Sequence, residues 1–189
     1  MIDLLIALLV NYYAVRSGAP VSDEDRTRLA TLARVNVEVC EAHPIKGWSL
    51  AQCVALVTTT QMWESGLLRK VHAGEQRGPS GERCVMQLHR EVVMIPRPVY
   101  AITREEWEKI EGTDEESTRA CVTLGLRALS WHITRCNIRL DGHQYLALAG
   151  LFNEYHRPSA RCRAMSSWLS GRRADTWATL AAKLSRGEK

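Results

Sequence analysis

The stretch that decides the fold is residues 49–64, SLAQCVALVTTTQMWE. It begins with Ser49 and Gln52, which have the spacing of a helix capping box. Apolar residues then recur at the i, i+3, i+4 and i+7 spacing of one helix face: Leu50, Cys53, Val54 and Val57. Further apolar residues extend this surface around most of the circumference, which indicates a buried central helix that ends at Glu64.

Four further capping signals occur along the chain, namely Ser22 with Asp25, Thr103 with Glu106, Thr113 with Glu116, and Asp141 with Gln144. Together with the apolar spacing, they predict helices near residues 3–16, 22–42, 49–64, 104–111, 114–135, 141–154 and 165–186. The polar, glycine-containing segment from Lys70 to Ser80 is expected to be a loop or a short irregular hairpin. The predicted fold class is therefore mainly α.

Length and composition favour one domain, because 189 residues of which 46% are hydrophobic can build a single sizeable core. Within it we expect N-terminal helices (1–47), a core (48–160) and a basic C-terminal helix (161–189). The net charge of +4 is too small to indicate a nucleic-acid binder, although it suits an anionic polymer surface. No apolar run reaches the roughly 20 residues of a membrane span. Residues 4–10 lack the preceding positive charge of a signal peptide.

The six cysteines include no CxxC pair, and the histidine and cysteine spacings fit no common zinc site, so neither a metal nor a cofactor is expected. Cys40 and Cys53 fall at neighbouring ends of two adjacent helices, and they are the expected disulfide in an oxidising compartment. Six reduced thiols are the alternative. On a single helix, Cys121 and Cys136 would lie about 22 Å apart and cannot pair. A thiol nucleophile, Cys84 with His89 or His132, is a further alternative.

Glu64 has the sequence context of a general acid. Such a group must hold its proton near neutral pH, whereas an unperturbed glutamate titrates near about 4.3. Glu64 follows Met62 and Trp63 at the C-terminal end of the central helix, where burial and the helix dipole disfavour a carboxylate. Downstream, Gly81–His89 brings an apolar Met86 and the amide of Gln87, which can hydrogen-bond an acetamido sugar. This combination suits cleavage of a glycosidic bond.

At three places the chain resembles the lytic transglycosylases of the lysozyme superfamily, in the branch of soluble transglycosylases and goose-type lysozymes. Glu64-Ser65 looks like that family's catalytic Glu-Ser pair. Residues 81–87, GERCVMQ, look like its Gly-x-x-Gly-Leu-Met-Gln loop, with Cys84 in place of the second glycine. Residues 149–154, AGLFNE, look like its late-helix Ala-Tyr-Asn segment, with Phe152 in place of the tyrosine. The resemblance covers roughly residues 49–160.

The resemblance implies a lysozyme-like fold and cleavage of the bond between N-acetylmuramic acid and N-acetylglucosamine in peptidoglycan. Glu64 would protonate the leaving oxygen and then, as a carboxylate, deprotonate the C6 hydroxyl, which leaves a 1,6-anhydro product. Ser65 would orient Glu64, and Met86 with Gln87 would hold the sugar. Because Phe152 has no hydroxyl, Asn153 and Tyr155 are the candidates for the family tyrosine's role at the acid.

Two alternatives share the same fold. A hydrolytic lysozyme generally needs a second carboxylate about 5–5.5 Å or about 6.5–9.5 Å from the first, and Glu75 and Glu82 are the candidates in the nearby loop. An inactive domain that binds glycan or a partner protein is the other alternative. For the enzyme and for the glycan-binding alternative, the expected partner is the peptidoglycan glycan strand at the bacterial cell wall, reached through the periplasm or by delivery from a virion.

Overall fold

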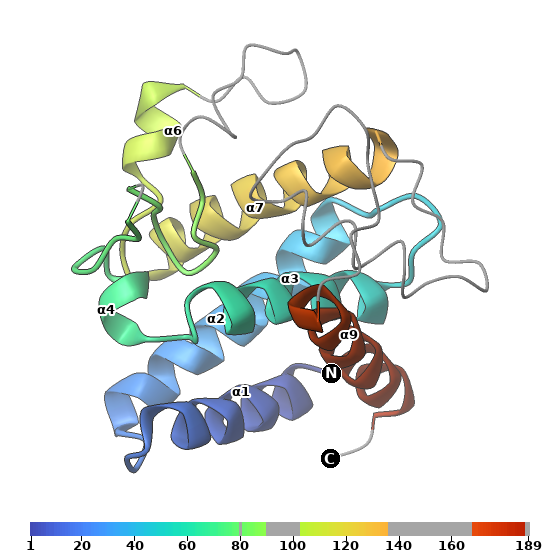
Figure 1. Cartoon of the computed structure of the whole chain (residues 1–189), viewed down its shortest axis with the longest axis horizontal. Coiled ribbons are helices and arrows are strands. Elements are labelled where there is room, and N and C mark those ends of the chain that lie inside the picture. Colours follow the sequence, from blue (N-terminus) through green and yellow to red (C-terminus); the bar gives the residue numbers. More distant parts are fainter. Residues whose placement is uncertain (80, 90–102, 136–167, 188–189) are drawn as a thin grey trace.

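The computed structural model describes residues 1–79, 81–89, 103–135 and 168–187. These ranges contain the helices α1 (Ile2–Ser17), α2 (Asp23–Ala42), α3 (Leu50–Glu64), α4 (Arg69–His72), α6 (Arg104–Glu108), α7 (Glu115–Arg135) and α9 (Trp168–Arg186) (Figure 1). The described residues hold no β-strand, only an isolated antiparallel bridge between Arg83 and Leu88. The mainly α class is therefore confirmed. The helix predicted at 141–154 lies outside the described residues.

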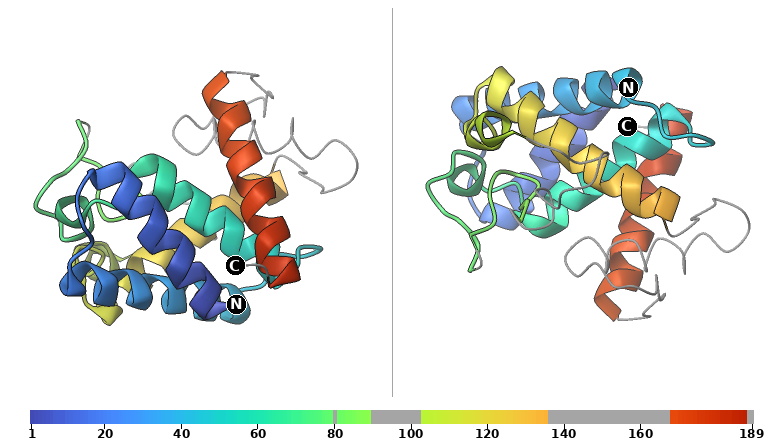
Figure 2. Two further views of the ribbon diagram at one scale, coloured as in Figure 1. Left: turned by 90° about the horizontal axis from the view of Figure 1, so that it is seen from below. Right: turned by 90° about the horizontal axis from the view of Figure 1, so that it is seen from above.

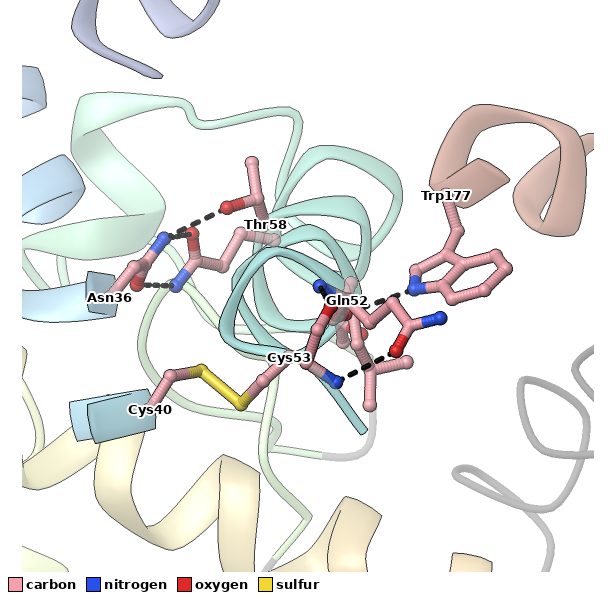
Figure 3. Close-up of a disulfide and its surroundings, with 10 residues drawn as sticks. Asn36, Cys40, Gln52, Cys53, Thr58 and Trp177 are labelled. Atoms are coloured by element: carbon pink, nitrogen blue, oxygen red, sulfur yellow. Dashed lines mark hydrogen bonds between the residues drawn. A yellow bond between two sulfur atoms is a disulfide. The ribbon is translucent and has the colours of Figure 1, made fainter. Parts of the chain in front are cut away.

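Helix α3 is the central helix, as its sequence predicts. Every residue from 53 to 61 is buried, and α3 packs against α2, α7 and α9 (Figure 1). Its N-terminus carries the expected capping box, in which the Ser49 hydroxyl accepts from Gln52 N and the Gln52 side chain accepts from Ser49 N. α9 crosses α3 (Figure 2), and at this crossing the Trp177 indole N–H donates to the Gln52 carbonyl at 3.0 Å (Figure 3).

Local capping signals place most helix starts correctly. Ser22 caps α2 and Thr103 caps α6, the latter with a complete capping box. The start of α7 differs by one residue, because Asp114 rather than Thr113 accepts the backbone N–H of Ser117, at 2.9 Å. This bond is the largest cause that lowers the pKa of the Asp114 carboxyl. The residue at which a helix ends is harder to predict than the presence of the helix. α6 ends at Glu108 instead of reaching residue 111.

Two disulfides join the described elements. Cys40 at the end of α2 pairs with Cys53 in α3, with 5.9 Å between the Cα atoms, which confirms the expected pair (Figure 3). Cys84 of the 81–89 segment pairs with Cys121 of α7 across 6.3 Å. Cys84 is thus fully buried, and its sulfur is part of a disulfide bond. The alternatives of six reduced thiols and of Cys84 as a nucleophile are both wrong for this structure.

A buried amide pair joins α2 to α3. Asn36 Nδ2 donates to Gln61 Oε1 and Gln61 Nε2 donates to Asn36 Oδ1, each at 2.8 Å, and Asn36 also donates to the Thr58 hydroxyl (Figure 3). Asn36 and Gln61 are both fully buried. Because buried polar groups are costly unless they are paired, this reciprocal arrangement fixes the register of the two helices.

No described helix combines the length and the apolar character needed to cross a lipid bilayer.

Candidate functional site

Glu64 and Gln87 line one cavity of about 730 Å³, which we call the glutamate cavity. It lies at the C-terminal end of α3. Its wall is formed by Tyr12 and Arg16 of α1, residues 62–66, Leu68, Val71, residues 76–79 and Gln87. The sequence-predicted acid and the sequence-predicted amide are therefore brought together at the same cavity by segments that are distant in sequence.

Glu64 is nearly buried and is paired with a cation. Its side chain is 8% exposed, and its Oε1 lies 2.7 Å from Nη1 of Arg173, whose side chain is 17% exposed. The Arg173 guanidinium also lies over the Trp63 ring, 5.8 Å from its centroid. The Trp63 indole N–H donates to Thr176 Oγ1 at 3.2 Å. Thus α9 supplies the groups that hold the end of α3, by the ion pair to Glu64 and the hydrogen bond to Trp63.

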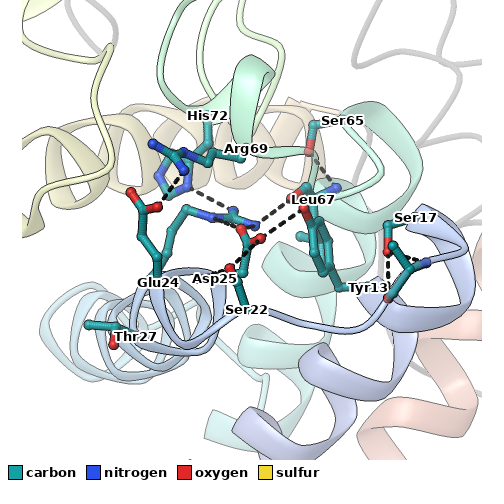
Figure 4. Close-up of polar contacts among 12 residues, drawn as sticks. Tyr13, Ser17, Ser22, Glu24, Asp25, Thr27, Ser65, Leu67, Arg69 and His72 are labelled. Atoms are coloured by element: carbon teal, nitrogen blue, oxygen red, sulfur yellow. Dashed lines mark hydrogen bonds and ion pairs between the residues drawn. The ribbon is translucent and has the colours of Figure 1, made fainter.

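Ser65 lines the glutamate cavity, but its hydroxyl forms hydrogen bonds with backbone groups. Ser65 Oγ donates to the Gln61 carbonyl at 2.8 Å and accepts from Leu67 N at 3.1 Å (Figure 4). The predicted role of orienting Glu64 is therefore not what these bonds do. They fix the turn that follows α3, in which Gly66 and Leu67 both have positive φ values, of 60° and 59°.

A buried charged network holds the other side of this turn. Arg28 of α2 donates to Asp25 Oδ1 and to the Leu67 carbonyl, and its Nη1 lies 3.3 Å from His72 Nδ1 (Figure 4). Because arginine only donates, His72 Nδ1 accepts and His72 Nε2–H donates to Thr118 Oγ1, at 3.0 Å. Burial, and then the Arg28 charge, lower the pKa of His72 to about 3. The neutral imidazole thus links α2, α4 and α7 behind the cavity wall.

Residues 83–88 form a tight hairpin. Arg83 and Leu88 exchange backbone hydrogen bonds of 3.0 and 2.8 Å, and Gln87 N donates to the Cys84 carbonyl at 3.0 Å. Cys84 has a φ of 57° and Gln87 a φ of 49°. A left-handed residue other than glycine costs roughly 1–2 kcal/mol, so the bridge to Cys121 and the packing of the loop must offset it. Cys84 thus has the left-handed backbone conformation that favours glycine, at the position where the lytic transglycosylase motif has its second glycine.

Met86 does not line the glutamate cavity. It is fully buried, and its side chain fills the space that a Cβ at Gly125 of α7 would need. The expectation that Met86 forms an apolar wall for a sugar is wrong, because the hairpin turns this residue towards the core. Gln87, one residue later, faces the cavity, and its Nε2 donates to the Cys84 carbonyl at 3.1 Å.

The two candidate second carboxylates lie in different places. Glu75 is exposed and is not part of the cavity wall, so its candidacy is wrong for this structure. The Glu82 carboxylate lies against Gly78, a wall residue, close to Gln87 Oε1. Glu64 is the only carboxylate among the described residues that lines the cavity. Asn153 and Tyr155 lie outside the described residues.

Two arginines that sequence reasoning did not identify stand at the rim. The Arg16 side chain lies along Gly66, and Arg16 has no carboxylate partner among the residues described. Arg77 donates to both carboxylate oxygens of Glu111, at 2.9 and 2.7 Å. Arg77 is paired with Glu111 and Arg173 with Glu64, so Arg16 supplies the one net positive charge among these described groups, which weakly favours an anionic ligand.

In comparisons with known proteins, no family model, no curated protein and no solved structure matches the chain.

Proposed function

We propose that this chain is a lysozyme-like domain that cleaves the glycan strand of peptidoglycan by the lytic transglycosylase route. The observation that carries the proposal is the placement of the nearly buried Glu64 carboxyl and the Gln87 amide on one cavity of about 730 Å³. A pocket of this size accommodates a few sugar rings. The proposed place of action is the bacterial cell wall, in the periplasm or after delivery from a virion.

The chemistry assigned to Glu64 uses one group twice. In the first step its proton goes to the glycosidic oxygen as the bond from C1 of the muramic residue breaks. In the second step the carboxylate takes the C6 hydroxyl proton as that oxygen closes on C1, so Glu64 ends the cycle protonated. Because the Glu64 carboxyl is paired with Arg173 at 2.7 Å, glycan entry has to loosen this contact before Glu64 can act as an acid.

The hairpin supports the proposal by presenting Gln87 rigidly. Met86 anchors it in the core and the Cys84–Cys121 bridge joins it to α7. The positive φ at Cys84 agrees with the glycine of the resembling motif. We assign Gln87 to binding an acetamido group, since its amide can both donate and accept.

The carboxylates around the cavity favour transglycosylation over hydrolysis. With Glu75 away from the wall, a hydrolytic lysozyme would depend on Glu82, whose carboxylate lies against Gly78 but does not line the cavity. A single acid suffices for the anhydro route, whereas hydrolysis generally needs two.

A second candidate function is glycan binding without cleavage. The specific observation that favours it is the ion pair between Glu64 and Arg173, because a carboxylate that stays paired with arginine does not donate a proton.

The deciding experiment incubates the full chain with purified peptidoglycan and follows released muropeptides by mass spectrometry. We expect products lighter by one water than hydrolysis products, and Glu64→Gln should lower their rate by at least about 100-fold. Glu75→Gln is the matched control, and it should cleave as fast as wild type. Equal rates for Glu64→Gln and wild type would contradict the catalytic assignment. Binding to insoluble peptidoglycan with no released product would select the second candidate.

A further inference from the structure

A second cavity, of about 540 Å³, lies between α1, α3 and α9. We call it the α1–α9 cavity. Its wall includes Leu9 and Tyr12 of α1, Thr58 and Met62 of α3, and a face of α9 that extends from residue 172 to Lys183. None of the chemistry assigned to Glu64 uses this cavity.

The α1–α9 cavity adjoins the glutamate cavity. Tyr12 and Met62 line both, and the Tyr12 hydroxyl donates to the Met62 carbonyl at 2.7 Å, so the two residues form one fixed ridge between the cavities. Along α3, Thr58 lies about 9 Å from Glu64 at 1.5 Å per residue. One branched ligand can therefore place a branch in each cavity across this ridge.

The lining of the α1–α9 cavity has an apolar floor and a cationic end. Leu9 is 1% exposed and Leu180 is 7% exposed. Lys183 is half-buried and has no carboxylate partner within the described part of the chain. The one acid of the lining, Asp175, stands eight residues earlier on α9, about 12 Å away along the helix axis. This surface fits a short segment with small apolar side chains that ends in a carboxylate.

We propose that the α1–α9 cavity binds the stem peptide of peptidoglycan while the glycan strand occupies the glutamate cavity. The inference rests on the proposed function, because the peptide is a branch of that same substrate. Such a peptide supplies small methyl side chains for the floor and a free carboxylate for Lys183. The site therefore selects peptide-bearing strands over bare ones.

The test compares peptidoglycan strands that carry stem peptides with strands from which an amidase has removed them. Lys183→Glu should raise KM for peptide-bearing strands by at least about fivefold and change KM for bare strands by less than about twofold. Arg26→Glu is the matched control, since Arg26 is an exposed residue of α2 that lines neither cavity. Lys183→Met, which keeps most of the side-chain length, should show a smaller effect of the same kind.

The outcomes separate the two proposals. If wild type cleaves both strands and Lys183→Glu affects them equally or not at all, the stem-peptide site is wrong and the proposed function stands. If wild type cleaves neither strand, calorimetry measures whether the chain binds free stem peptide. Binding that Lys183→Glu weakens would overturn the cleavage proposal alone, and no binding would overturn both. Binding of an anionic fatty acid in preference to the peptide would also contradict the stem-peptide assignment.

Discussion

Replacing Arg173 by methionine removes the cation beside Glu64 but keeps an apolar side chain against Trp63. The pair is close, at 2.7 Å, with side chains 8% and 17% exposed. At an effective dielectric constant of about 20 its Coulomb attraction is about 6 kcal/mol, and desolvation of the two charges offsets most of this. We expect a net coupling of about 2 kcal/mol, and we expect Arg173→Met to lower the free energy of unfolding by about 3 kcal/mol, since it removes the cation beside a nearly buried carboxylate.

The assay is a double-mutant cycle by urea unfolding at neutral pH and low salt. It uses wild type, Glu64→Gln, Arg173→Met and the double variant. The exposed pair between Arg69 and Glu24, with side chains 47% and 65% exposed, provides the reference cycle and should give no more than about 1 kcal/mol. A Glu64–Arg173 coupling no larger than this reference would refute the view that α9 holds the carboxylate by charge.

Two further predictions concern pH and the disulfides. The pKa of His72 is lowered to about 3 in the folded chain, whereas it is about 6.5 in the unfolded chain. Between these two pH values the unfolded chain binds one proton more than the folded chain. The stability that depends on neutral His72 is therefore complete above this window and is lost as pH falls through it. Guanidinium unfolding at several pH values should show that His72→Asn reduces the slope by up to about 1.4 kcal/mol per pH unit, and an unchanged slope would contradict the neutral imidazole. Loop lengths of 37 and 13 residues give losses of about 4 kcal/mol for the paired serine substitutions of Cys84 and Cys121, and about 3 kcal/mol for those of Cys40 and Cys53. Only the first change should also slow peptidoglycan cleavage, because only that bridge holds the hairpin, and equal rates for the two variants would contradict this role.

Local sequence signals accounted for most of the described helices. The capping box of Ser49 and Gln52 acts within one turn, so its geometry follows from spacing alone. Cys40 and Cys53 were predictable as a pair because a short connection joins the ends of two neighbouring helices. Cys84 gave no such signal for Cys121, since their pairing depends on how the 81–89 segment crosses α7.

The site was less accessible to sequence reasoning. Glu64 and Gln87 were both identified, and the structure places them on one cavity. The contact between Arg173 and Glu64 was not predicted, because Arg173 reaches Glu64 only through the crossing of α9 over α3, which no local pattern encodes. Met86 was misassigned for a related reason. Which side chains of a hairpin face the core and which face the cavity depends on the hairpin's register. A register shift of one residue exchanges the two sets.

Helix α9 lines the α1–α9 cavity and also contacts Glu64 and Trp63, although none of its residues lines the glutamate cavity. Arg173 and Thr176 contact Glu64 and Trp63 at the end of α3, and Thr176 also belongs to the wall of the α1–α9 cavity. A ligand in the α1–α9 cavity therefore contacts the same helix that, under the proposed function, has to release Glu64 before proton transfer. If both proposals hold, we expect peptide-bearing strands to be cleaved with a higher kcat as well as a lower KM than bare strands, because the proposed peptide site and the cation paired with Glu64 belong to one helix.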